Sequence, residues 1–237
     1  MITEDILVIK EVSYKENDKI LHAISRNMGK IQLISKGAKK PNSHLVNVSQ
    51  VFAHARCSLT ISRDMYIITS AELIDNFYGL KNSMDAYFNA SYILELIGYV
   101  AQENEYDRKI FDMTVSVLKF LEDCPQNYEK LVSAYELKLV SMLGYKPDFG
   151  QCISCGRQIR EDALFSIKEG GLLCSGCVKY GNGINVTYGE ILTLERILKT
   201  KFENIGSVEV NPRIRNLIRD YLYYYIGKDH FTTLKLI

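Results

Sequence analysis

The sequence alternates between apolar and mostly polar residues in the stretch Val51-Phe52-Ala53-His54-Ala55-Arg56-Cys57-Ser58-Leu59-Thr60-Ile61. Successive side chains of a β-strand point to opposite faces, so this alternation predicts a strand with one buried face. The predicted buried face comprises Val51, Ala53, Ala55, Cys57, Leu59 and Ile61. Cys57 is then a small core residue, because free cysteine packs as a hydrophobe.

The neighbouring segments have the same character. The other four predicted strands are residues 6–9, 19–26, 30–36 and 65–74, the last joined to the quoted strand by a turn at Arg63-Asp64. Short strands with turns about every eight to twelve residues predict a small antiparallel barrel. Because the region also carries a basic face and a basic loop at residues 37–43, we expect an OB-fold, which binds single strands in a charged groove.

After Asn76 the apolar residues recur at every third or fourth position, which predicts helices. The predicted helices are residues 86–100, 107–121, 128–143, 187–198 and 211–225. The predicted fold class is therefore α+β. A five-stranded OB-fold barrel at residues 1–78 is followed by an all-α bundle domain at residues 79–237, which carries a zinc-binding module inserted at residues 150–180.

The inserted module is predicted from four cysteines, Cys152, Cys155, Cys174 and Cys177. Two residues between paired cysteines let a tight turn aim both sulfurs at one point, and two such turns form a tetrahedral thiolate cage for one structural Zn²⁺. Gly156 and Gly176 are expected to adopt positive φ within these turns. The alternative is two disulfides or four free thiols. A cage filled by four protein ligands leaves no position for a reactive water.

Charge is distributed unevenly along the chain. From Lys19 to Arg63 there is no acidic residue, whereas the whole chain has a net charge of only +1. Such a local excess of positive charge is typical of a protein that binds a phosphate backbone. The predicted DNA-binding residues are Arg26, Lys30, Lys36, Lys39, Lys40, Arg56 and Arg63. The alternative is a solvated strand face, since lysine also protects exposed strands.

The sequence lacks motifs for catalysis and for export. It has no phosphate-binding G-x-x-x-x-G-K-[ST] loop, no H-E-x-x-H and no G-x-S-x-G, so we predict no catalytic residues and no enzyme. No run of eighteen apolar residues occurs, and residues 1–5 begin an acidic stretch without the apolar core of a secretory signal. We therefore expect a cytoplasmic protein without a membrane partner.

Two passages carry a resemblance to a known family. Lys36-Gly37-Ala38-Lys39-Lys40, with Ser43, follows the third predicted strand, and Leu143-Gly144-Tyr145-Lys146-Pro147 leads into Cys152-Ile153-Ser154-Cys155-Gly156. Both passages, and the order of strands, helices and cysteines, resemble the RecO family of bacterial recombination mediators. Lys39 and Lys40 stand where arginine is common in that family, which keeps the charge but loses bidentate phosphate geometry.

The resemblance implies a function in DNA repair. It implies binding of single- and double-stranded DNA, annealing of complementary strands, and action with RecR and with the acidic tail of single-stranded DNA-binding protein at the nucleoid. For this tail we predict a receptor at Arg213, Arg215 and Arg219, beside apolar residues of the last helix. Alternatively, those apolar residues are core and the arginines a solvated rim. The alternative function is a zinc-ribbon adaptor that binds RNA or protein in transcription or translation.

Overall fold

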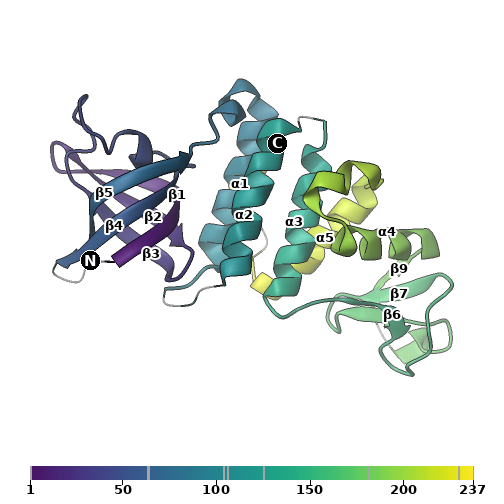
Figure 1. Cartoon of the computed structure of the whole chain (residues 1–237). Coiled ribbons are helices and arrows are strands. Elements are labelled where there is room, and N and C mark those ends of the chain that lie inside the picture. The colour runs from purple at the N-terminus through teal and green to yellow at the C-terminus, as the bar shows by residue number, and fades with distance from the viewer. Residues whose placement is uncertain are drawn as a thin grey trace. The chain divides into compact units, whose positions relative to one another are not determined.

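The N-terminal strands close into a barrel. In the computed structural model the strands are β1 (Ile2–Tyr14), β2 (Asp18–Ser25), β3 (Gly29–Ser35), β4 (His54–Ser62) and β5 (Met65–Asp75). They are ordered β1-β2-β3-β5-β4 around the closed barrel, and only β3 and β5 pair in parallel (Figure 1). The structure describes residues 2–62, 65–103, 105, 107–124, 126–180, 182–228 and 230–236. The predicted five-stranded barrel is confirmed.

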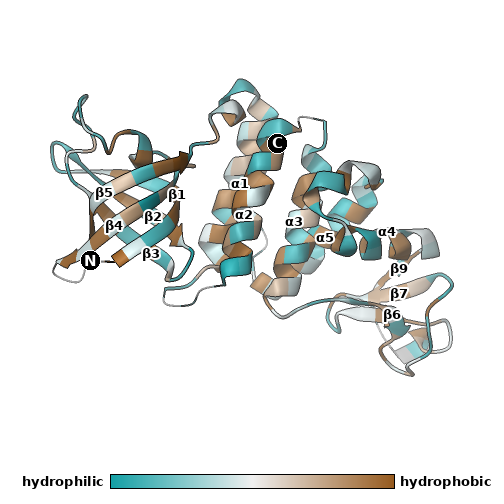
Figure 2. Ribbon diagram, viewed as in Figure 1, coloured by the Kyte–Doolittle hydropathy of each residue, from teal (hydrophilic) through white to brown (hydrophobic). Residues whose placement is uncertain are grey.

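The barrel core follows the alternation seen in the sequence (Figure 2). Ala53, Ala55, Cys57 and Leu59 are fully buried, as predicted, but Ile61 is 61% exposed because β4 ends at the next residue. The strand begins at His54 and not at Val51, since Phe52 has a φ of 75° that a strand cannot continue. Ala38, Leu45 and Val48 belong to the same buried cluster, so the segment between β3 and β4, which includes η1 (Asn47–Ser49), packs onto the barrel core.

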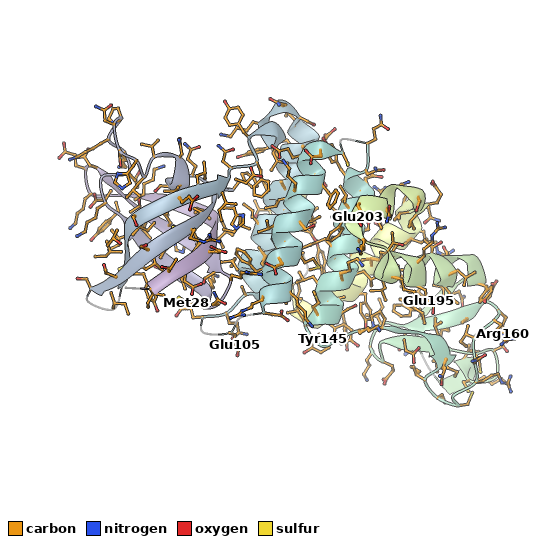
Figure 3. All side chains as sticks on the ribbon, in the orientation of Figure 1. Met28, Glu105, Tyr145, Arg160, Glu195 and Glu203 are labelled. Atoms are coloured by element: carbon orange, nitrogen blue, oxygen red, sulfur yellow. The ribbon has the colours of Figure 1, made fainter. Side chains whose placement is uncertain are left out.

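Two helices pack beside the barrel. They are α1 (Met84–Val100) and α2 (Arg108–Asp123), preceded by the short helix η2 (Tyr78–Asn82). The Ser83 and Asp107 side chains accept hydrogen bonds from backbone N–H groups and cap α1 and α2. The turn at Met28 lies close to Glu105 (Figure 3), and a Cβ added to Gly29 there would lie 2.2 Å from the Glu105 carbonyl oxygen. Only glycine permits this approach.

Unit 2 combines the remaining helices with a small sheet. They are α3 (Tyr128–Met142), α4 (Tyr188–Lys199) and α5 (Pro212–Ile226), with η4 (Phe202–Ser207) between the last two. The predicted helices are thus confirmed. The sheet is formed by the chain segment that follows α3 and precedes α4, and it has the strand order β6-β8-β7-β9. Its strands, which were not predicted, are β6 (Asp148–Cys152), β7 (Ala163–Ser166), β8 (Gly171–Leu173) and β9 (Ile184–Val186), with η3 (Val178–Tyr180) after β8.

The chain packs as two units. Unit 1 comprises Met1–Pro125 together with Phe231–Ile237, and unit 2 comprises Gln126–His230. The returning segment of unit 1 places the Phe231 ring edge-on to Tyr92, with ring centroids 5.5 Å apart, and includes η5 (Thr233–Leu236). These units reflect packing. The predicted boundary between domains 1–78 and 79–237 follows a change in secondary structure and stays a prediction.

Candidate metal centre and candidate nucleic-acid interface

The four predicted cysteine ligands come together in unit 2. The Sγ atoms of Cys152, Cys155, Cys174 and Cys177 all lie within 4.8 Å of one another. Cys152 ends β6, whereas Cys174 directly follows β8, and the parallel pairing of these two strands brings the two turns face to face. Tyr145 lies where the chain leaves α3 for this module, and Arg160 lies within the module (Figure 3).

Backbone hydrogen bonds shape each cysteine turn. In the first, the Gly156 N–H donates to the Cys152 carbonyl at 2.8 Å, and in the second the Cys177 N–H donates to the Cys174 carbonyl at 2.8 Å. Gly156 has a φ of 72°, as predicted for this turn. The same expectation for Gly176 was wrong, because its φ lies outside the positive range. The second turn closes on helix-like bonds, including Val178 N–H to Cys174 carbonyl, which need no left-handed residue.

The environment of Cys152 favours its thiolate. Burial opposes ionisation of this thiol, but the backbone N–H groups of Cys174, Cys155 and Ser154 outweigh that effect and lower the pKa of Cys152 to about 6. A hydrogen bond from the Ser154 side chain favours the thiolate of Cys177. Hydrogen bonds between Cys177 and the side chains of Cys155 and Cys174 act in the opposite direction, and the pKa of Cys177 is raised to about 11. Four sulfurs this close repel one another when ionised, so a cation is needed for all four to be thiolates.

The module therefore has the ligands and spacing of a metal site. Four thiolate donors at mutual distances below 4.8 Å suit a tetrahedral ion. All six cysteines of the chain are free of disulfide bonds in this structure. The four cysteines can hold one metal ion.

Three of the predicted DNA-binding residues gather at one end of the barrel. Lys36, Lys39 and Lys40 are exposed on the loop after β3. The Lys39 Nζ donates to the carbonyls of Lys15 and Glu16 in the β1–β2 turn, at 3.3 and 3.4 Å. The Lys39 N–H donates to the Asn17 carbonyl, so the two loops are joined. We call Lys15, Lys36, Lys39 and Lys40 the loop lysine cluster.

Sequence reasoning missed Lys15 and its neighbour Tyr14. The Lys15 ammonium lies 5.2 Å from the centre of the Tyr14 ring, which is 36% exposed. A signal for Lys15 was present in the predicted topology. In an antiparallel meander the turn after the first strand and the loop after the third leave the same end of the sheet. Lys15 therefore had to lie near Lys39.

Three of the other predicted DNA-binding residues have partners within unit 1. Arg26 forms a bidentate ion pair with Asp112 of α2, at 2.9 and 2.8 Å, and Arg56 pairs with Asp5 of β1 at 2.8 Å. These carboxylates raise the pKa of each guanidinium, first through the hydrogen bond. Lys30 Nζ donates to the Gly98 carbonyl at 2.6 Å. Arg63 lies outside the described residues.

The predicted receptor arginines on α5 also form ion pairs. Arg213 pairs with Glu190 at 3.4 Å, Arg215 pairs with Glu129, and Arg219 pairs with the fully buried Glu136 at 3.2 Å. The apolar residues beside them, Leu217, Ile218, Tyr221 and Leu222, are buried. This arrangement is the one expected for a core with an arginine rim, and the receptor stays a prediction.

The fold and the site define a class. The chain is an α+β protein in which a closed OB-type barrel with a lysine-rich end is joined to helices that carry a four-cysteine metal module. Family models named "Recombination protein O N terminal" and "Recombination protein O C terminal" match residues 1–77 and 81–235.

Several proteins similar to this chain are named "DNA repair protein RecO". "DNA repair protein RecO" of Clostridium novyi is 32% identical over 224 residues, covering 94% of this chain and 87% of that protein. The RecO proteins of Acetivibrio thermocellus and Alkaliphilus metalliredigens are 31% and 27% identical, over 88% and 100% of this chain and 83% and 98% of theirs. The chain belongs to the RecO family, whose members are recombination mediators of DNA repair. None of the described helices has the length and apolarity to cross a membrane.

Proposed function

We propose that this protein binds single- and double-stranded DNA through the loop lysine cluster and anneals complementary strands without enzymatic turnover. The observation that carries the proposal is the convergence of exposed lysines from two hydrogen-bonded loops at one end of an OB-type barrel. The loop between strands 1 and 2, together with the face of strands 2 and 3, is where OB-folds bind oligonucleotides. The mechanism is electrostatic. Ammonium groups that hold two strands together reduce the repulsion between their phosphates and release counterions.

The first experiment tests the loop lysine cluster. Alanine at Lys36, Lys39 and Lys40 together should weaken binding to all DNA sequences alike and reduce the slope of log affinity against log salt by about 2, at about 0.7 per phosphate contact on single strands. The matched control replaces the exposed Lys81, Lys109 and Lys146 by alanine, which removes the same charge elsewhere. An equal slope change in both variants contradicts the assignment, because it reports net charge alone.

Annealing distinguishes the two candidate functions. A mediator should speed the pairing of complementary oligonucleotides, including strands coated with single-stranded DNA-binding protein, whereas an adaptor for RNA or protein should not. The proposal includes RecR as a partner and the nucleoid of a bacterium as the place of action. Both come from family membership, and co-purification with RecR on gel filtration tests the first.

For the acidic tail of single-stranded DNA-binding protein, we keep the predicted receptor at Arg213, Arg215 and Arg219. The test is titration of a tail peptide against Arg213→Glu and Arg215→Glu. These two arginines pair with carboxylates that keep some solvent exposure, whereas Arg219 pairs with a buried carboxylate. Unchanged peptide affinity in both variants places the receptor elsewhere.

We further propose that the metal is one structural Zn²⁺ per chain, held by Cys152, Cys155, Cys174 and Cys177. Four sulfur ligands within 4.8 Å support this proposal, because tetrahedral thiolate sites favour zinc. The ion would neutralise the four thiolates and join the two turns. Metal analysis should find one zinc per chain, and X-ray absorption should show sulfur ligands only. Oxygen or nitrogen ligands, or protein without metal, would contradict it.

A further inference from the structure

A cavity of about 520 Å³ lies between the outer face of the barrel and α1, wholly within unit 1. Aliphatic side chains of Ile9, Val51 and Leu94 form its wall. Lys10, His22 and Lys30 line it from three neighbouring strands, where Lys10 pairs with His22 across β1 and β2. The volume lies in the range of small-ligand sites, and the lining combines an apolar surface with basic groups.

The cavity has an excess of positive charge. Among the described residues that line it, one is acidic, Glu95 of α1. That carboxylate accepts hydrogen bonds from the Thr232 N–H and from the Thr233 N–H and hydroxyl, at 3.0, 3.0 and 2.7 Å. Lys30 uses one of its three ammonium protons for the Gly98 carbonyl, which leaves two for a ligand. Two lysines therefore face one carboxylate that is already well solvated by protein donors.

The cavity is lined by residues of the same strands, β2 and β3, that lead to the loop lysine cluster. On β3, Lys30, Gln32 and Ile34 share the outward face, and Lys36 follows in the same alternation. Six residues of strand separate Lys30 from Lys36, a distance of about 20 Å. Across β2, Ile20 pairs with Ile34 and His22 pairs with Gln32. This path has a cationic site at each end, with Gln32, Ile20 and Ile34 between them.

We propose that the cavity is a second phosphate-binding site on the DNA-binding face, which takes one nucleotide of a single strand with its phosphate at Lys10, His22 and Lys30. Its nucleoside then lies against Ile9, Val51 and Leu94. The inference rests on the proposed DNA binding. A strand that reaches from this cavity to the loop lysine cluster matches the ~4–16 nucleotides that one OB-fold covers.

His22 couples this site to pH. In the free protein, burial and then the charges of Lys10 and Lys30 lower the pKa of His22, so the imidazole is neutral at pH 7. A bound phosphate raises that pKa by supplying negative charge, while Glu95 stays engaged with the Thr232–Thr233 segment. Binding therefore takes up a proton. Single-strand affinity should rise as the pH falls from 8 towards 6, by at most about tenfold per pH unit for one proton.

The first test compares variants of the cavity. Lys10→Ala should weaken binding of oligothymidylate on the order of threefold to tenfold at 0.15 M salt, and His22→Gln should remove the pH dependence between 6 and 8. Lys109→Ala, an exposed lysine of α2, controls for net charge. His44→Gln, on the exposed loop after β3, controls for a histidine beside the loop lysine cluster. Equal effects in control and cavity variants overturn the inference.

The second test observes His22 directly. The chain has four histidines, so the imidazole C–H signals in proton NMR can be assigned with His22→Gln. Adding oligothymidylate should raise the pKa of His22. If this pKa stays unchanged while the loop lysine cluster still binds DNA, the cavity inference fails and the proposed function stands. If the wild type binds no DNA, the proposed function itself fails. A larger response to an acidic peptide than to the oligonucleotide identifies the cavity as a peptide site and also overturns the inference.

Discussion

The ion pair between Arg219 and Glu136 allows a quantitative prediction for unit 2. The Glu136 carboxylate is completely buried on α3, and Arg219 of α5 lies 3.2 Å from it with 32% of its side chain exposed. Arg219→Ala leaves a buried charge without this partner, which costs about 3–5 kcal/mol of the free energy of unfolding. At about 2–4 °C per kcal/mol, the midpoint of thermal unfolding should fall by roughly 6–20 °C.

The assay is urea and thermal unfolding, with hydrogen exchange to locate the loss in α3 and α5. Arg196→Ala, an exposed arginine of α4, is the control and should change stability by no more than about 0.5 kcal/mol. The double variant Glu136→Leu with Arg219→Met should recover most of the loss, because neither charge then remains buried. A loss below about 1 kcal/mol for Arg219→Ala, or a double variant less stable than the single one, refutes the reasoning.

Three further predictions concern other parts of the chain. Removal of the metal with a chelator, or Cys174→Ser, should raise hydrogen exchange in residues 148–186 and leave the barrel unchanged, since the four ligands lie within unit 2; protection lost in β1–β5 would contradict this. His54→Leu should stabilise unit 1 by about 1 kcal/mol at pH 5.5, because neither ring nitrogen has a hydrogen-bond partner among the described residues. Burial lowers the pKa of His54, so the unfolded state binds more protons and native stability falls as the pH drops below about 6.5; the leucine variant should lack that component. Burial, and then the Asp5 carboxylate, raise the pKa of Cys57 to about 12. A thiol reagent at pH 8 should therefore modify Cys57 only after unfolding, and rapid labelling of Cys57 in the native protein would show that β4 opens.

The elements with a regular period were predictable from the sequence. Ala55, Cys57 and Leu59 alternate inward on β4, and the third-and-fourth spacing of α1 to α5 gave the helices to within a few residues. The strands of the metal module were not predicted because they have only three to five residues each. So short a strand shows no period, and its position depends on the cysteine turns that it connects.

The candidate sites were predictable where spacing alone decides geometry. Four cysteines in two C-x2-C turns had to meet, and they do. Whether a basic side chain is paired with a carboxylate depends instead on residues distant in sequence. Arg26 meets Asp112, 86 residues away, and Arg219 meets Glu136, 83 residues away. Net charge along the chain cannot reveal such pairs. Among the described residues, the lysines of the loop lysine cluster form no ion pair, and both loops that carry them lie at one end of the barrel.

The return of residues 231–236 to unit 1 has a consequence for synthesis of the chain. Phe231 packs on Tyr92, and Thr233 donates two hydrogen bonds to Glu95, so α1 receives part of its packing from residues made after the whole of unit 2. The barrel strands can pair while the ribosome is still translating unit 2. The wall of the cavity beside His22, to which Thr232 and Thr233 contribute, cannot be complete until translation has passed them. A nascent chain stalled before residue 231 therefore presents its loop lysines without a finished cavity.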